Sequence, residues 1–250
     1  MVVVGLALAL VIGLTLGLFG GGGSILTVPV FVYVLGFDPK LAIAMSFPVV
    51  GATSLVGAIG NWRAGNVRLS SALLFGVVAM AGAYGGARAS GLLDGRSQLL
   101  ILGVAMAAAA VMMLRSAGRE PAAAAVRTVP SRALYLVAFS VGALTGVIGI
   151  GGGFLIVPAL VVFGQVPMRE AVGTSLLVIA MNCVSGYVGL RDIRAIPWSF
   201  VVTFSAVAIA GILAGTRLAA FVPQRTLKKG FAVLLLVIAA VVLWQNRGKL

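Results

Sequence analysis

Hydrophobic residues fall in ten runs, separated by short junctions that hold most of the charges. Most of the runs approach the roughly 20 residues that a bilayer-spanning helix needs. The second and seventh hold only about 12 residues each, too few to cross a bilayer alone. The pattern therefore predicts an all-α, polytopic membrane protein. The runs cover residues 2–18, 24–36, 41–60, 70–88, 97–114, 132–149, 153–164, 170–189, 197–217 and 229–245.

A glycine run interrupts the first hydrophobic stretch, where Gly20–Gly23 and Ser24 precede an apolar arm that contains Pro29. One helix over residues 1–36 would be about 54 Å long, against a hydrocarbon core of about 30 Å. Each glycine costs about 1 kcal/mol relative to alanine in a helix. We therefore expect a helix, a glycine turn and a shorter arm that together form a bent hairpin.

The same break recurs in the second half of the chain, 129 positions later. Chance hydrophobicity would not keep glycine, proline and arginine in register over such a distance, so the chain is predicted to be an internal duplication. The third segment also matches, with Ser46 against Ser175. The other pairs are Gly13 and Gly142, Gly17 and Gly146, Gly20 and Gly149, Gly22 and Gly151, Gly23 and Gly152, Pro29 and Pro158, Gly82 and Gly211, Gly86 and Gly215, Arg88 and Arg217, and Arg96 and Arg225.

A polar stretch divides the chain into an N-terminal membrane repeat (1–115), a connector (116–131) and a C-terminal membrane repeat (132–250). Five segments per repeat would place the two repeats in opposite membrane orientations. Eleven of the 18 basic residues then fall on the connector side, which favours a cytoplasmic connector and both termini outside. If each hairpin were a single pass, the repeats would be parallel and the split would be eight against ten.

The composition agrees with a membrane protein, since 61% of the residues are hydrophobic and only 9% are charged. The net charge of +13 is spread over the junctions, without the basic face that nucleic-acid binding needs. The chain has no histidine and one cysteine, Cys183, in an apolar run. We therefore expect no enzyme, no metal site, no cofactor and no nucleic-acid partner. The N-terminus is interpreted as the first membrane segment rather than a cleaved signal.

Short, glycine-interrupted segments at matching positions of two repeats are typical of secondary transporters. A helix that starts after the glycines exposes unpaired N–H groups and a positive dipole end, which suits an anion. The alternative is that the glycines only allow close helix packing, which we favour for Gly13, Gly17, Gly82 and Gly86. The predicted substrate-binding residues of the two breaks are Gly20, Gly21, Gly22, Gly23, Ser24, Gly149, Gly151, Gly152 and Gly153.

Polar residues recur in the third segment of each repeat and are predicted to complete the binding site. Isolated hydroxyls in membrane helices often bond to their own backbone instead, and this alternative stays open. The candidates are Ser46, Thr53, Ser54, Thr174, Ser175 and Asn182.

All five acids lie at segment ends or in connectors, so no carboxylate within the membrane is expected to relay a proton or a sodium ion. A coupling proton or sodium ion, if one is used, would bind hydroxyls, carbonyls or these rim acids. Polar residues at the segment ends either anchor the protein at the membrane interface or line an anion pathway. The pathway candidates are Asn61, Arg63, Arg88, Arg191 and Arg217.

The glycine-rich motif from Gly142 to Pro158, the element from Ala171 to Ser175 and the connector from Asn61 to Val67 resemble the TauE/SafE family of sulfite exporter-like permeases. The resemblance spans nearly the whole chain and both repeats. It implies export of a small sulfur-containing anion, such as sulfite, sulfoacetate or another organosulfonate, across the bacterial inner membrane. An uptake permease or a channel for the same anions is the alternative, and the oligomeric state stays open.

The chain departs from the family pattern in two places. The first repeat has Met45 where the second has Thr174, so one expected hydroxyl is absent. The second repeat has Arg191-Asp192-Ile193 where the first has Asn61-Trp62-Arg63.

Overall fold

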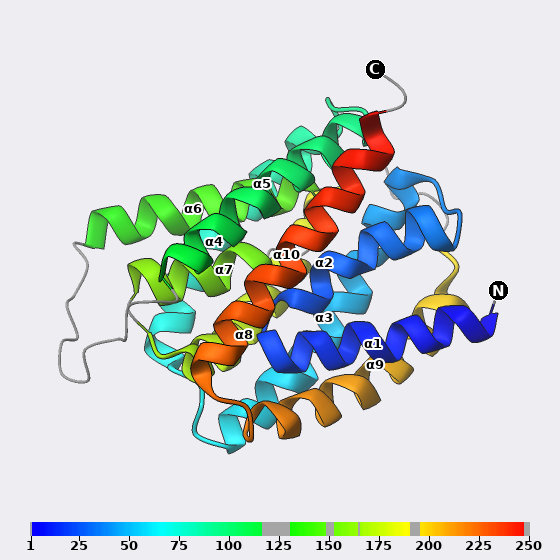
Figure 1. Cartoon of the computed structure of the whole chain (residues 1–250). Coiled ribbons are helices and arrows are strands. Elements are labelled where there is room, and N and C mark those ends of the chain that lie inside the picture. The colour runs from blue at the N-terminus through cyan, green and yellow to red at the C-terminus, as the bar shows by residue number, and fades with distance from the viewer. Residues whose placement is uncertain (1, 117–130, 149–152, 165, 191–195, 248–250) are drawn as a thin grey trace.

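The computed structural model describes residues 2–116, 131–148, 153–164, 166–190 and 196–247. Within these ranges every regular element is a helix, which confirms the predicted all-α class (Figure 1). The helices are α1 (Val2–Phe19), α2 (Gly22–Pro29), the π-helix η1 (Val30–Val34), α3 (Pro39–Arg63), α4 (Leu69–Ser90), α5 (Gly95–Ser116), α6 (Ser131–Ile148), α7 (Gly153–Pro158), the π-helix η2 (Ala159–Phe163), α8 (Met168–Gly189), α9 (Trp198–Ala219) and α10 (Gln224–Arg247).

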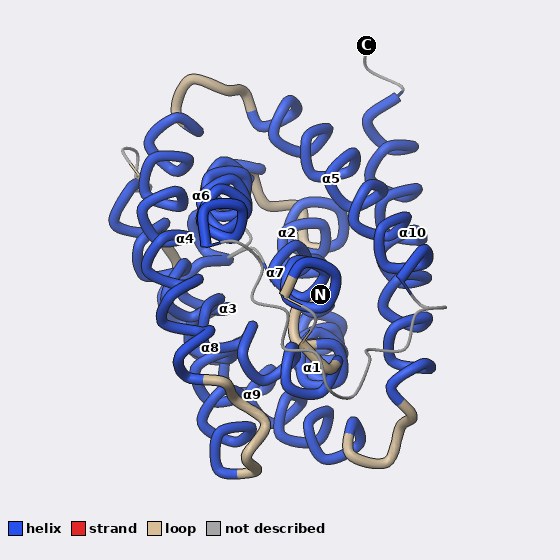
Figure 2. Tube along the Cα trace, turned by 90° about the vertical axis from the view of Figure 1, so that its left-hand side faces the viewer, coloured by secondary structure: helices blue, strands red, loops and turns tan. Residues whose placement is uncertain are grey.

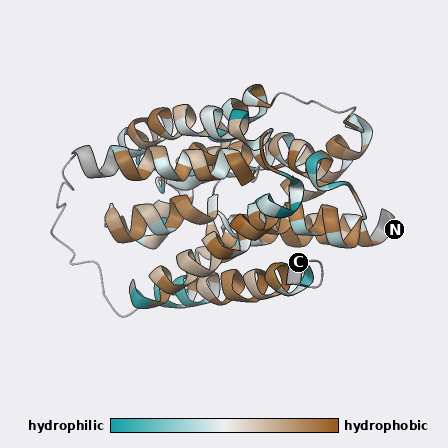
Figure 3. Cartoon of the chain, turned by 90° about the horizontal axis from the view of Figure 1, so that it is seen from above, coloured by the Kyte–Doolittle hydropathy of each residue, from teal (hydrophilic) through white to brown (hydrophobic). Residues whose placement is uncertain are grey.

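Six of the described helices, α3, α4, α5, α8, α9 and α10, are long and apolar enough to cross a membrane. Large apolar side chains lie exposed on their outer faces, for example Val77, Val104 and Val202. Figure 3 shows hydrophobic residues along the helices and more hydrophilic ones toward several helix ends. This distribution suits a surface in contact with lipid and confirms a polytopic membrane protein.

The predicted hairpin is present in the first half of the chain. Helix α1 ends at Phe19, Gly20 turns the chain with φ of 69°, and α2 begins at Gly22. The arm folds back along α1, since a β-carbon on Gly23 would lie 2.0 Å from the carbonyl oxygen of Ile12. In the second half α6 ends at Ile148 and α7 begins at Gly153, with residues 149–152 outside the described ranges.

Both short arms change from α-helix to π-helix after a proline. Proline has no N–H and displaces the carbonyl of the preceding turn, so the hydrogen-bond pattern shifts. Leu35 N donates to Val30 O at 3.0 Å, and Gly164 N donates to Ala159 O at 3.1 Å. These bonds lie 129 positions apart, so the two arms share their irregular geometry as well as their sequence.

Each half of the chain packs its first helix against the fourth hydrophobic segment of the other half. A β-carbon on Gly13 of α1 would lie 2.0 Å from Ala208 O of α9, and one on Gly142 of α6 would lie 2.0 Å from Ala79 O of α4. Gly142 lies 129 positions after Gly13, and Ala208 lies 129 positions after Ala79. The two contacts are therefore reciprocal between the halves. These glycines therefore serve close helix packing, and the halves are intertwined (Figure 1).

Helices α3 and α8 pack against each other in opposite directions. Gly186 of α8 lies against the ring of Phe47, whereas Gly57 of α3 lies against Leu176. The short arms α2 and α7 lie near the middle of the bundle, between α3 and α8 on one side and α10 on the other (Figure 2). The broken segments are thus enclosed by spanning helices.

Candidate functional site

The two arms meet at their first residues. A β-carbon on Gly21 would lie 2.2 Å from the carbonyl oxygen of Gly153, and one on Gly153 would lie 2.8 Å from the α-carbon of Gly21. Only glycine allows this approach of two backbones. The structure therefore brings the predicted glycines Gly20–Gly23 and Gly153 together, whereas Gly149, Gly151 and Gly152 lie outside the described residues.

The N-terminus of α2 offers backbone donors rather than a side-chain cap. Gly21 precedes the helix without a capping side chain, and the N–H groups of a first turn have no acceptor within their own helix. The hydroxyl of Ser24 donates to Gly21 O at 2.7 Å. The hydroxyl proton of Ser24 is therefore bonded at the start of its own helix. The first turn of α2 presents main-chain N–H groups in the protein interior.

Ser175 ties the end of α1 to α8. Its hydroxyl oxygen lies 2.8 Å from Gly20 O and 2.8 Å from Val172 O, and its single proton is shared between the two carbonyls. A β-carbon on Gly20 would lie 2.6 Å from the α-carbon of Val172, so the turn rests directly on α8. Ser175 therefore has a positioning role, in which it joins the two halves at the glycine break.

Asn182 is a buried polar side chain that the described residues leave unsatisfied. It is 0% exposed, and neither its amide nitrogen nor its amide oxygen has a hydrogen-bond partner within the described residues. It shares one face of α8 with Ser175, which binds Gly20, and with Ile179, which contacts Gly153. An unpaired buried polar group costs about 1–3 kcal/mol. The face of α8 that borders the break thus carries a free amide.

Ser54 is the second unsatisfied group. Its hydroxyl is fully buried and has no partner among the described residues. It lies between Gly51 and Gly57, which pack on Cys183 and Leu176 of α8, so it belongs to the face of α3 that meets α8. Buried groups of this kind bind an ordered water or a ligand.

The remaining polar candidates have partners. Ser46, Thr53 and Asn61 each donate to a carbonyl three or four residues earlier in α3, at 2.7, 2.7 and 3.0 Å. This arrangement favours the alternative of backbone bonding for Ser46 and Thr53. The hydroxyl of Thr174 accepts from Arg68 N at 3.0 Å, between the α3–α4 loop and α8.

The predicted arginines lie at the rim of the protein. Arg63, Arg88 and Arg217 are exposed, and none of them lines a described cavity. Arg88 donates to the hydroxyl of Tyr84 at 2.7 Å and covers its ring, as interfacial anchors do. Arg191 lies outside the described residues. No cluster of potential metal ligands occurs in the described part of the chain.

A small polar cavity, here called the connector-end cavity, lies where the α3–α4 loop, the start of α8 and the end of α9 converge. Its volume is about 60 Å³. Of its polar residues, only Asn61 was a predicted pathway residue. Asn66 belongs to the family motif from Asn61 to Val67, whereas no sequence pattern pointed to Arg169 or Thr216 as site residues. The lining residues are Leu18, Asn61, Asn66, Arg169, Val172, Thr216, Ala219, Ala220 and Leu227.

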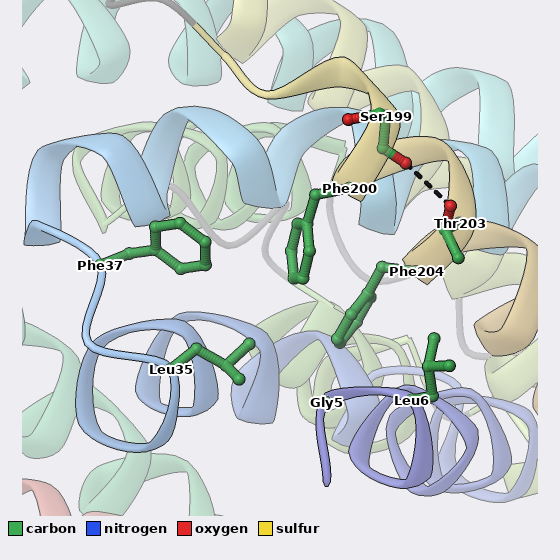
Figure 4. A pocket seen from close by; sticks show the side chains of 8 residues that line it. All are labelled: Gly5, Leu6, Leu35, Phe37, Ser199, Phe200, Thr203 and Phe204. Atoms are coloured by element: carbon green, nitrogen blue, oxygen red, sulfur yellow. Dashed lines mark hydrogen bonds between the residues drawn. The ribbon is translucent and has the colours of Figure 1, made fainter. Parts of the chain in front are cut away.

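The opposite end of the bundle holds a different cavity, of about 370 Å³, between α1, the end of η1 and the start of α9 (Figure 4). Phe37, Phe200 and Phe204 line it, and the ring centroids of Phe200 and Phe204 are 5.4 Å apart. The hydroxyl of Thr203 donates to Ser199 O in its own helix. This aromatic cavity has no cation in its lining and is poorly suited to an anion.

Comparisons with known proteins agree along the length of the chain. The family model described as "Sulfite exporter TauE/SafE" matches residues 5–242. A "Probable membrane transporter protein" of Xylella fastidiosa is 34% identical, covering 96% of this chain and 94% of the relative. Relatives with similar names in Bacillus subtilis and Methanocaldococcus jannaschii are 25% and 23% identical, covering 87% and 82% of this chain and 90% and 78% of their own. No solved structure matches.

Proposed function

The chain belongs to the sulfite exporter TauE/SafE family, and we propose that it exports a small sulfur-containing oxyanion, either sulfite or an organosulfonate such as sulfoacetate. It is a multi-pass membrane transporter of the bacterial inner membrane. The description of the family model supports the proposal of a sulfur oxyanion and an outward direction. The chemistry of the buried polar groups supports an anion independently.

The free amide of Asn182 is the observation that carries the proposal. Its nitrogen supplies two N–H donors, and the first turn of α2 supplies backbone donors and a positive dipole end. Ser54 adds a hydroxyl. In our proposal the oxyanion accepts hydrogen bonds from these neutral groups, which bind it without the strong attachment of a buried cation and so allow its release.

The residues around the break favour an anion over a cation. Of the acids in the described residues, Asp38 and Asp94 precede α3 and α5, and Glu170 lies in the first turn of α8. Carboxylates within the membrane mark cation and proton pathways, and the interior of the described helices supplies none. A coupling proton or sodium ion would therefore use hydroxyls, carbonyls or these rim acids.

We infer that the repeats 1–115 and 132–250, joined by the connector 116–131, are inverted in the membrane. The reciprocal glycine contacts and the antiparallel packing of α3 and α8 support a two-fold axis in the membrane plane. Transporters of this type expose a central site alternately to each side by rocking one group of helices against another. The charge bias favours a cytoplasmic connector.

Efflux from proteoliposomes loaded with labelled sulfite tests the proposal. The wild-type protein should release sulfite saturably, and organosulfonates should compete. Asn182→Leu should lower the efflux rate at least about tenfold, because the amide donors are lost. The matched control is Thr145→Val, since Thr145 is equally buried but bonds to Gly142 O of its own helix at 2.8 Å. It should keep the wild-type rate.

Four outcomes would contradict parts of this account. Release no faster than from empty liposomes would exclude sulfite export. Unchanged efflux by Asn182→Leu would place the site elsewhere. Equal, unsaturable passage of chloride and sulfite would indicate the alternative, an anion channel, and strictly inward transport would indicate an uptake permease.

A further inference from the structure

We infer that the connector-end cavity is a separate loading site, where Arg169 and Asn66 select a small oxyanion before it reaches the glycine break. The inference rests on the proposed function and adds to it an entry subsite, a charged residue and a size limit. No predicted site residue except Asn61 lies in this cavity.

The guanidinium of Arg169 is held in place yet keeps donors available. Its Nη2 donates to Ala220 O at 2.7 Å and to Val222 O at 3.5 Å, which fixes the side chain against the end of α9. A guanidinium carries five N–H groups, and the others have no acceptor within the described residues. Arg169 also lies in the first turn of α8, where the helix dipole adds positive potential. The cavity therefore attracts anions.

A neutral donor completes the cavity. The backbone of Asn66 is fixed, since its N–H donates to Asn61 O at 2.9 Å and its carbonyl rests on Gly173 of α8. The side-chain amide of Asn66 has no partner within the described residues, whereas the hydroxyl of Thr216, in the same lining, donates to Leu213 O at 3.1 Å. A guanidinium together with a free amide is a set of donors that binds an oxyanion.

One residue separates this cavity from the glycine break. Val172 lines the cavity and also carries the α-carbon on which Gly20 rests. Asn182 lies ten residues further along α8, or about 15 Å away. The connector-end cavity and the amide of Asn182 thus lie at two positions along α8, and Val172 lies between Arg169 and Asn182 in the sequence.

The opposite end of the bundle differs at matching positions. Lys40 is the counterpart of Arg169, and it donates to Ser90 O at 3.0 Å and to Leu93 O at 2.6 Å, as Arg169 does to the end of α9. Both ends thus anchor a basic side chain on backbone carbonyls. The counterparts of Thr216 and Asn61 are Ala87 and Leu190, which have no polar side chain. These differences favour loading at the connector end.

The volume of the cavity limits what it accepts. A water molecule needs about 10–15 Å³ of such space, so about 60 Å³ accommodates roughly four waters or a compact oxyanion. Sulfite and methanesulfonate are of this size, whereas benzenesulfonate is too large. In competition for efflux from the connector side, methanesulfonate should inhibit sulfite transport and benzenesulfonate should not.

The test compares variants in membrane vesicles of both orientations, with the apparent KM for sulfite measured from each side. Arg169→Gln should raise the KM about tenfold from the connector side, with little change in maximal rate or in the KM from the other side. Arg169→Lys should restore it to within about threefold, since lysine makes the same carbonyl contacts at position 40. Arg63→Gln removes an equal charge at the same end, outside the cavity, and should have no effect.

Asn66→Ala provides a second variant, because it removes a side chain without described bonds and leaves the fold intact. It should raise the connector-side KM several-fold. An unchanged KM in both Arg169→Gln and Asn66→Ala, an equal rise on both sides, or an equal effect of Arg63→Gln would overturn the inference while the proposed function stands. A wild-type protein that moves no sulfite would overturn the proposed function and this inference with it.

Discussion

Gly21 and Gly153 are in backbone contact, although 132 positions separate them in the chain. Each is adjacent to the start of a short arm, so the two broken segments meet at the point where the regular hydrogen bonds of each helix begin. The contact explains why a glycine run is retained deep in an apolar segment in spite of its cost in a helix.

Alanine at position 21 should disrupt this contact. The added β-carbon would meet the carbonyl oxygen of Gly153, and neither backbone can move freely. We expect Gly21→Ala to cost about 1–3 kcal/mol and to abolish transport, as measured by thermal unfolding in detergent and by sulfite efflux. Gly85→Ala is the control, since nothing lies within 4 Å of its β-carbon position. Wild-type behaviour of Gly21→Ala would mean that the arms are apart in the working protein.

Asn182→Leu should raise the stability of the protein while it lowers the rate of transport. The unpaired amide of Asn182 destabilises the unliganded protein by about 1–3 kcal/mol, and leucine would remove that cost. The variant should therefore unfold at a higher temperature while it loses transport. A lower unfolding temperature would show that the amide has a structural partner, and Thr145→Val serves as the control for a hydroxyl that is already bonded.

The reciprocal glycines predict equal costs in the two halves. Gly13→Ala and Gly142→Ala would each place a β-carbon 2.0 Å from a carbonyl oxygen of the neighbouring helix. Their unfolding temperatures should fall by similar amounts, corresponding to about 1–3 kcal/mol each. If one variant is neutral and the other is not, the two halves do not pack equivalently.

The ion pair of Arg68 with Glu170 should contribute little to stability. Their side chains are 40% and 31% exposed, and pairs of this kind contribute about 0–1 kcal/mol. Glu170→Gln should therefore shift the unfolding temperature only slightly, and the shift should vanish in 1 M salt. Thr174→Val should cost about 1 kcal/mol in any salt, because it removes the acceptor of Arg68 N–H. A large, salt-resistant effect of Glu170→Gln would contradict this ranking.

The sequence predicted the elements closely because hydropathy and glycine cost are local properties. The arm expected over 24–36 is observed as Gly22–Val34, and the arm expected over 153–164 as Gly153–Phe163. The π-helical turns after Pro29 and Pro158 were not predicted, since they depend on how the shifted carbonyls find new donors. The hydropathy pattern of the sequence does not show which new donors these carbonyls find.

The site was less predictable, because hydrogen-bond satisfaction depends on neighbours from distant parts of the chain. Thr53 and Asn182 occupy matching positions and were equal candidates, yet only Asn182 is left without a partner. Arg169 was missed for the same reason. It gains its surroundings from Asn66 and Thr216, and only the folded structure brings these three residues to one cavity.

An experimental structure with saturating sulfite would test the central claim most directly. The account predicts a bound anion within about 2.7–3.2 Å of the amide nitrogen of Asn182, near the first turn of α2. An Asn182 amide that bonds only to protein groups, with the anion elsewhere or absent, would contradict it.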